Sequence, residues 1–296
     1  MKMTERQLID ELTSRGPVLT DGAWGTELQQ RGLEPGEMPD AWNLLHPDRV
    51  EAVARAYVEA GSRIILTNTF RANRIAFAAR ADVEHIAEIN RVGVQISKRA
   101  AGDSALVFAS IGPSGKLLVT GEVSEEQLAE AFSEQASAQA EGGADALVVE
   151  TMGDLIEARL AVEAAKATGL PVVGCMVFDS GRQKDRTMMG VTPEQAAKEL
   201  TAFGVDVVGA NCGNGVAQYV PICSRLATST ALPIWIKPNA GIPKLVKGEV
   251  VYETTAEEFA GFLPKLVEAG ASFIGGCCGT DPRFIAALRQ QLADTA

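Results

Sequence analysis

The chain of 296 residues has a formal net charge of −11, and 46% of its residues are hydrophobic and 22% charged. This composition supplies a large apolar core and excludes global disorder, and an acidic chain gains nothing from a phosphate backbone, which disfavours nucleic-acid binding. The apolar runs are about one strand long, far short of the ~20 residues of a membrane-spanning helix, and the N-terminus lacks the apolar stretch of a signal peptide, so we expect a soluble cytoplasmic protein.

Short β-branched or apolar runs alternate with amphipathic, Ala- and Glu-rich stretches along the whole chain. Eight such runs cover residues 17–22, 63–70, 105–113, 145–151, 171–179, 205–212, 233–239 and 272–278. They are apolar throughout rather than alternating, which is typical of strands buried on both faces of a parallel sheet.

The stretches between these runs predict helices. Residues 47–60 carry apolar side chains at helical spacing. Ser124, Thr192 and Thr255 each stand three residues before a Gln or Glu, the pattern of a capping box. Glycines shortly before the next strand predict C-terminal helix caps; these are Gly61, Gly143, Gly169, Gly204 and Gly270.

Eight strand–helix units joined by right-handed crossovers predict an α/β fold, a (β/α)₈ TIM barrel that forms a single domain over residues 1–296. An open doubly wound sheet is the main alternative, but no GxGxxG follows the first strand. Residues 179–190 and 240–253 are longer than their connections require, so they predict either substrate loops or ordinary solvated loops.

Unusual polar residues and cysteines stand at the predicted carboxyl ends of strands, where barrels keep their active sites. They are Asp21, Asn68, Thr69, Glu150, Asn211, Cys212, Lys237, Asn239, Cys277 and Cys278. This coincidence across several strands predicts a site at one mouth of the barrel.

The five cysteines fall into two groups. Cys277 and Cys278 are adjacent and flanked by glycines, and Cys212 ends the sixth predicted strand. Three thiolates with a fourth position open are typical of a catalytic zinc site, although small buried thiols are the alternative. Cys175 lies within a strand and Cys223 within a helix, so we expect both to pack in the core. An odd number of cysteines without an export signal does not indicate a disulfide framework.

The charged strand-end residues allow several roles. Asp21 and Glu150 could form an acid–base pair, anchor a substrate ammonium group, or cap a neighbouring turn. Lys237 could form a Schiff base or have a structural role. His46 and His85 lie in or beside helices, which disfavours a histidine metal site or a Ser-His-Asp triad.

Five motifs resemble the homocysteine S-methyltransferase family, most closely the homocysteine-binding module of cobalamin-dependent methionine synthase. The resemblance runs from about residue 16 to the C-terminus. The motifs are DGAWGTEL (21–28), LTNTF (66–70), NCGNG (211–215), KPNAG (237–241) and GGCCGTDP (275–282).

This resemblance implies a (β/α)₈ barrel that transfers a methyl group to homocysteine and gives methionine, with one Zn²⁺ per chain. The matching zinc ligands are Cys212, Cys277 and Cys278. The matching substrate contacts are Asp21 and Glu150 for the amino group, the backbone of Gly22 and Ala23 for the carboxylate, and Asn211 and Asn239 nearby.

The sequence has no segment that matches a corrinoid-binding domain, so we expect an external methyl donor. A separate methyl-corrinoid protein is favoured, and a small sulfonium or betaine donor is the alternative. Two other functions remain open: a corrinoid-linked methyltransferase that uses another thiol acceptor, and a non-catalytic barrel that docks a corrinoid protein.

Overall fold

The computed structural model describes residues 5–246 and 249–295, and its centre is an eight-stranded parallel sheet in the order β1-β10-β7-β6-β5-β4-β3-β2. Its strands are β1 (Val18–Leu19), β2 (Ile64–Ile65), β3 (Leu106–Ile111), β4 (Ala146–Met152), β5 (Val172–Met176), β6 (Val207–Cys212), β7 (Ile234–Pro238) and β10 (Ala271–Ile274). The two end strands meet where the Arg63 N–H donates to the Leu19 carbonyl at 2.9 Å. The sheet is therefore curled into a barrel, and the open-sheet alternative is wrong.

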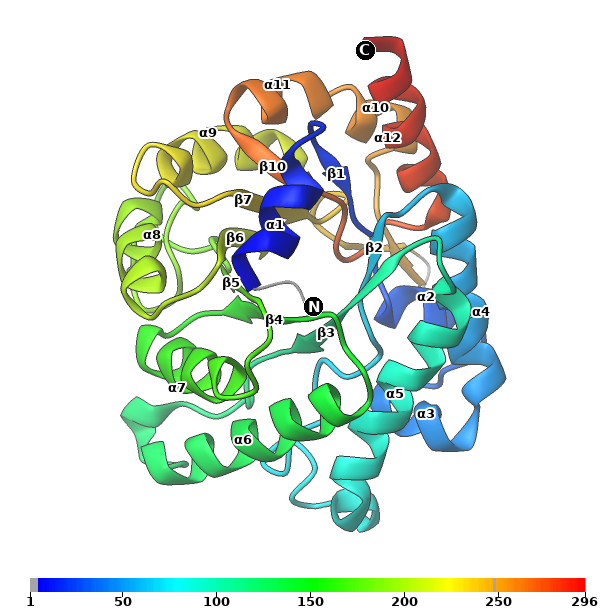
Figure 1. The fold of residues 1–296 in the computed structure, drawn as a ribbon, viewed down its shortest axis with the longest axis vertical. Coiled ribbons are helices and arrows are strands. Elements are labelled where there is room, and N and C mark those ends of the chain that lie inside the picture. The colour runs from blue at the N-terminus through cyan, green and yellow to red at the C-terminus, as the bar shows by residue number, and fades with distance from the viewer. Residues whose placement is uncertain (1–4, 247–248, 296) are drawn as a thin grey trace.

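Helices surround the sheet on its outside, and α1 lies across one end of the barrel (Figure 1). The helices are α1 (Glu5–Thr13), α2 (Gly25–Gln30), α3 (Trp42–Leu45), α4 (Pro47–Ala60), α5 (Ile86–Ala101), α6 (Glu125–Glu141), α7 (Leu155–Lys166), α8 (Pro193–Ala202), α9 (Val216–Ala227), α10 (Ala256–Ala260), α11 (Leu263–Glu268) and α12 (Pro282–Thr295). None of the helices in the described ranges is long and apolar enough to cross a membrane.

The prediction of a (β/α)₈ barrel is confirmed, and so are its local signals. Ser124, Thr192 and Thr255 each form the complete capping box at the start of α6, α8 and α10. Each glycine that was predicted to end a helix has a positive φ, from 73° to 111°. β1 and β2 are only two residues long, so the predicted runs there extend beyond the regular ladder into the residues that form the mouth.

The interior of the barrel contains a separate apolar cluster. Trp235 stacks on Phe108 with ring centroids 6.0 Å apart and packs against Phe273 at 5.4 Å. Ile9 of α1 is buried in the same cluster, so α1 closes this end of the barrel. Cys175 belongs to this inner cluster and Cys223 to the larger core between sheet and helices, as predicted.

The two long loops differ in structure. Residues 240–253 contain a β-hairpin that the sequence analysis did not predict, formed by β8 (Lys244–Val246) and β9 (Glu249–Val251). Residues 179–190 contain only an isolated bridge between Ser180 and Arg186. Both loops follow the carboxyl ends of their strands and therefore lie at the mouth opposite α1.

Candidate functional site

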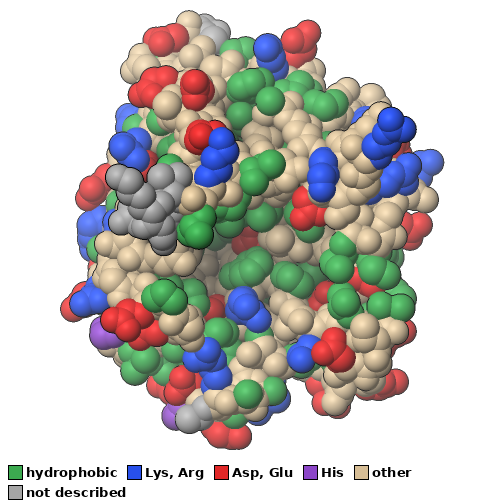
Figure 2. All heavy atoms as spheres, turned by 180° about the vertical axis from the view of Figure 1, so that it is seen from behind, with side chains coloured by type: hydrophobic (Ala, Val, Ile, Leu, Met, Phe, Trp, Pro, Cys, Tyr) green, Lys and Arg blue, Asp and Glu red, His purple; other side chains and the backbone are tan. Residues whose placement is uncertain are grey.

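The mouth of the barrel is seen in Figure 2, which shows the molecule from behind and a hollow near the middle of this face. The strand-end residues singled out in the sequence lie at this mouth, on β4, β6, β7 and the segments that follow β1, β2 and β10. Parallel strands in a barrel bring their carboxyl ends to one face, so residues far apart in sequence meet here.

Three of the cysteines form one cluster. The sulfur atoms of Cys212, Cys277 and Cys278 all lie within 4.8 Å of one another. Cys212 is the last residue of β6 and has a φ of 68°, in the left-handed region that few non-glycine residues adopt. Such strained backbone geometry concentrates at functional sites.

The cysteine pair is held by its backbone and by glycines. The Cys277 N–H donates to the Pro238 carbonyl at 2.8 Å, and the Cys278 carbonyl accepts from the Ala240 N–H at 3.0 Å. At Gly275, a Cβ atom would lie 2.0 Å from Thr20 Oγ1 and 2.5 Å from the Asp21 carbonyl oxygen. Glycine is therefore required where the segment after β10 crosses the segment after β1.

The three thiols share their protons unequally. Cys277 and Cys278 donate hydrogen bonds to Cys212, which lowers the pKa of the Cys212 thiol. The same contacts with Cys212 raise the pKa of Cys277 and of Cys278. A cluster of this kind gives up one proton readily and keeps the others until a cation replaces them.

The geometry of the cluster fits a tetrahedral metal ion. Zinc–sulfur bonds of about 2.3 Å place the sulfurs of such a site about 3.8 Å apart, which is compatible with the observed limit of 4.8 Å. The Asn211 Nδ2 atom lies 3.9 Å from Cys277 Sγ and donates to it. Three soft sulfur ligands favour zinc over magnesium or calcium and leave a fourth position for another ligand.

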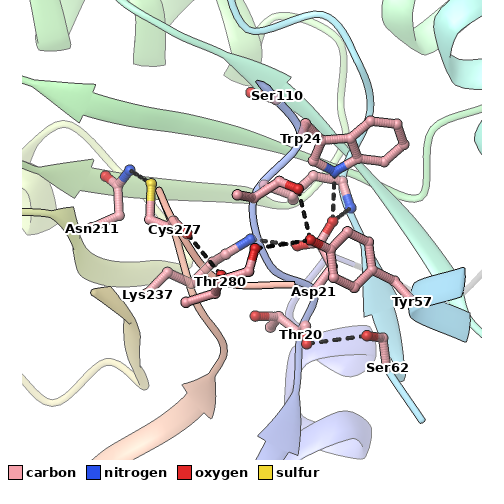
Figure 3. Close-up of polar contacts among 12 residues, drawn as sticks. Thr20, Asp21, Trp24, Tyr57, Ser62, Ser110, Asn211, Lys237, Cys277 and Thr280 are labelled. Carbon is pink, nitrogen blue, oxygen red and sulfur yellow. Dashed lines mark hydrogen bonds and ion pairs between the residues drawn. The ribbon is translucent and has the colours of Figure 1, made fainter. Parts of the chain in front are cut away.

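Asp21 is fully buried beside the cluster and has several donors around it (Figure 3). Its Oδ2 atom accepts from Trp24 Nε1 at 2.8 Å and from the Leu66 N–H at 2.7 Å. Its Oδ1 atom accepts from the Lys237 ammonium group. Asp21 therefore links the segment after β1 to β7 and to the segment after β2.

Glu150 is the second buried carboxylate of the mouth. Its Oε1 atom accepts from Ser110 Oγ at 2.5 Å, and its Oε2 atom accepts from Asn211 Nδ2 at 3.1 Å. Burial raises the pKa of Glu150 to about 7, although the positive charge of Lys237 acts in the opposite direction. Glu150 can therefore exchange a proton near neutral pH or pair with a cation from a ligand.

Lys237 is 2% exposed and forms an ion pair with Asp21 across the mouth. Burial opposes its charged form, but the nearby charges of Asp21 and Glu150 outweigh burial and raise the pKa of Lys237. An amine that stays protonated is a poor nucleophile, so this geometry disfavours the Schiff-base hypothesis and favours a structural or electrostatic role.

The remaining predicted contacts lie around these groups. A Cβ atom at Gly22 would be 2.7 Å from the hydroxyl of Tyr57, so the turn after β1 is tightly packed. The Ala23 N–H has a long hydrogen bond of 3.4 Å to the Thr280 carbonyl. Asn239 Nδ2 donates to the Gly213 carbonyl at 2.6 Å, and Asn239 Oδ1 is buried with no hydrogen-bond partner.

Asn211 connects the two parts of the site. Its Oδ1 atom accepts from the Thr151 N–H at 2.7 Å, and its Nδ2 atom donates to Thr151 Oγ1 at 2.6 Å as well as toward Glu150 and Cys277. Thr151 has a φ of 61°, a second strained position at the mouth. One amide thus positions the buried carboxylate and the cysteine cluster relative to each other.

The sequence analysis missed several residues that support the site. Trp24 and Thr280 stand inside the recognised motifs and could have been singled out there, whereas Ser110 lies within an apolar strand and gives no signal. Tyr252 follows the hairpin, and its ring would lie 2.2 Å from a Cβ atom at Gly279, next to the cysteine pair. Burial and the negative charge of the cysteines raise the pKa of Tyr252 to about 12.

The family model that matches this chain is described as homocysteine S-methyltransferase, and it covers residues 18–292. The chain belongs to the homocysteine S-methyltransferase family. The resemblance noted in the motifs is thereby confirmed, and the protein is an enzyme of the S-methyltransferase class.

The curated relatives include two methionine synthases. The chain is 30% identical to the methionine synthase of Mycobacterium tuberculosis, over 98% of this chain and 26% of that protein. It is 30% identical to the enzyme of Mycobacterium leprae, over 95% of this chain and 24% of that protein. The chain thus spans about a quarter of the length of these relatives.

Solved structures of similar architecture include the homocysteine methyltransferase MmuM from Escherichia coli. Its metallated form superimposes with a TM-score of 0.80 at 25% identity, covering 96% of this chain and 99% of that chain. Its oxidized form gives a TM-score of 0.78, with 93% and 96% of the two chains covered. The similarity therefore extends over the whole barrel.

Proposed function

We propose that this enzyme transfers a methyl group to the thiol of homocysteine and releases methionine, with one Zn²⁺ held by Cys212, Cys277 and Cys278. The observation that carries the proposal is the meeting of three sulfur atoms within 4.8 Å at the mouth of the barrel. The metallated form of the similar enzyme MmuM supports a metal in this fold.

The bound zinc would supply one chemical effect, because a thiol that coordinates Zn²⁺ loses its proton and is held as a thiolate near neutral pH. The chain supplies the remaining conditions. The three cysteines leave one position open for the substrate sulfur, and Asn211 donates toward Cys277 and holds the cluster beside Glu150.

The amino acid end of homocysteine would bind next to the cluster. Asp21 and Glu150 provide buried negative charge for the ammonium group. The turn at Gly22 and Ala23 offers backbone N–H groups for the carboxylate, and the long Ala23 hydrogen bond leaves that donor available. Asn239 lies beside the cluster with its Oδ1 atom free to accept a hydrogen bond.

The methyl donor is proposed to be external: a separate methyl-corrinoid protein, or otherwise a small donor. The methionine synthases favour the first, and the barrel-length enzyme MmuM shows that a homocysteine methyltransferase can consist of this fold. All five cysteines are free thiols, which supports a reducing compartment, so we propose the cytoplasm.

A donor screen tests this function directly. Zinc-loaded protein is incubated with homocysteine and, in turn, methylcobalamin, a methylsulfonium compound and a betaine, and methionine is quantified. We expect methionine from at least one donor and about one zinc per chain.

The matched variants are Cys278→Ala and Cys223→Ala. The first removes a proposed ligand, and we expect loss of both zinc and turnover. The second alters a cysteine buried elsewhere and is expected to keep both. Full activity in Cys278→Ala would refute the site. If other thiols are offered beside homocysteine and the enzyme strongly prefers one without an amino acid group, homocysteine is not the acceptor.

A further inference from the structure

Lys237 is the first residue of the KPNAG motif and lies beside the proposed binding site for the amino acid end of homocysteine, although methyl transfer itself requires no cation there. It lies near the end of β7, two residues after the core residue Trp235, and its side chain is 2% exposed. Figure 3 shows its ammonium group directed at the carboxylate of Asp21. Burying a cation costs free energy unless the cation is paired, so the ion pair with Asp21 is what allows Lys237 to be buried at this position.

Lys237 changes what Asp21 can offer to a substrate. A carboxylate accepts about four hydrogen bonds. Trp24 and the Leu66 N–H bind Oδ2, and Lys237 binds Oδ1. The protein therefore already fixes the orientation of Asp21 and neutralises its charge.

Glu150 is placed differently. The groups that donate directly to it, Ser110 and Asn211, are both neutral. Glu150 as a whole is only 6% exposed, so a cation brought by a ligand would meet little competition from water. The raised pKa of Glu150 agrees with a buried carboxylate whose charge is not fully compensated.

We propose that Lys237 is a positioning residue: its ammonium group pairs with Asp21 and leaves Glu150 to receive the single ammonium group of the substrate. Among these three side chains, the ion pair cancels the charge of Asp21, and an ionised Glu150 leaves one negative charge, which matches one amino group. The inference rests on the proposed function for the amino acid nature of the substrate, and it divides the roles of two acids that the family resemblance treats together.

The test uses ligands that need neither zinc nor a methyl donor. L-methionine and its deamino analogue 4-(methylthio)butanoate differ only in the amino group, and their dissociation constants are measured by calorimetry on the full chain. For the wild type we expect a preference of about 100-fold for methionine, the size of a charge-assisted hydrogen bond in a buried site. A wild type without this preference would overturn the inference.

Two variants separate the carboxylates. In Glu150→Gln the preference is expected to fall below about 5-fold, because the receiving charge is lost. In the double variant Asp21→Asn with Lys237→Met, the ion pair is replaced by neutral groups, and at least a third of the wild-type preference is expected to remain. Lys244→Met, an exposed lysine on β8, is the control and is expected to leave the preference unchanged.

If Glu150→Gln keeps the preference for methionine, or if the folded double variant loses it, Asp21 and not Glu150 receives the amino group. Glu150→Gln breaks no ion pair, so it decides the question even if the double variant does not fold. Methionine formation is assayed separately. Its failure with every donor, while the ligand preference persists, would refute the proposed activity and leave the role of Lys237 standing.

Discussion

The interior of the barrel has two layers, and the same strands supply both. On β7, Trp235 lies in the apolar layer near α1, and Lys237 lies in the polar layer at the mouth. β4 makes the same change from Val148 to Glu150. Alternate residues of a strand point to the same face, so a step of two residues, about 6.6 Å, separates packing from chemistry.

This comparison explains how the enzyme can hold strained and charged groups. The apolar layer near α1, here called the lower layer, consists mainly of large apolar side chains that supply stability, and it buries the indole Nε1 of Trp235 without a hydrogen-bond partner. The upper layer holds the cysteine cluster and the Asp21–Lys237 ion pair, whose burial costs free energy. We therefore expect substitutions in the lower layer to change stability and substitutions in the upper layer to change function.

The largest effect is expected from a cysteine in the upper layer. Cys212→Ser removes one proposed ligand, and because a thiolate is lost, both the bound zinc and at least about 1,000-fold in turnover are expected to disappear. Cys175→Ala, in the lower layer, is the matched change and is expected to keep one zinc per chain. Zinc content and turnover of the purified variants are measured. Equal loss of zinc in both variants would contradict the claim that only the upper layer binds the metal.

The next largest effect concerns the apolar layer. Phe273→Ala removes a ring that packs against Trp235, and a cavity of this kind costs about 3–5 kcal/mol of unfolding free energy. Denaturant unfolding measures the loss. The folded variant is expected to bind zinc as the wild type does, and a stable variant that has lost its metal would contradict the division.

A pH effect distinguishes the layers further. The pKa of Glu150 is raised to about 7, above its ordinary value, so the folded protein binds this proton more tightly than the unfolded chain. Proton binding by Glu150 therefore adds about 3 kcal/mol to the free energy of unfolding. This stabilisation is fully present below about pH 4.5 and is lost as the pH rises through 7.

Unfolding free energies of the reduced wild type and Glu150→Gln at pH 5 and pH 7.5 measure this contribution. Asp40, whose pKa burial raises to about 6, titrates in the same direction in both proteins and cancels in the difference. If the two proteins lost stability equally between these pH values, Glu150 would not be the group responsible.

The smallest effect is expected far from both layers. Thr192→Ala removes the side-chain cap of α8 on the outside of the barrel, which costs about 1 kcal/mol. Zinc content and turnover are expected to stay at wild-type values. A changed zinc content would mean that the outer helices control the mouth more directly than the layers indicate.

Much of this arrangement could be predicted from the sequence because its signals are local. Apolar runs and capping patterns such as Ser124 with Gln127 predicted the barrel. Glycines around Cys277 and Cys278 marked a turn at a strand end, and the barrel fold then brought Cys212 to the same mouth.

The contacts across the mouth could not be predicted in the same way. Asp21 follows β1 and Lys237 lies on β7, two strands that are separated by β10 in the sheet, and the long lysine side chain joins them. Ser110 donates to Glu150 from inside an apolar run that carries no polar signal. The strands of the β8–β9 hairpin have only three residues each and begin with the charged residues Lys244 and Glu249, so the sequence analysis interpreted this segment as a loop.

The central claim is that three cysteines hold zinc and leave one position for the thiol of the substrate. X-ray absorption at the zinc edge, measured with and without homocysteine, tests it directly. The account predicts three sulfur ligands and one lighter ligand in the free enzyme, and four sulfur ligands after homocysteine is added. A coordination shell that does not gain a sulfur, or that holds fewer than three sulfurs in the free enzyme, would contradict it.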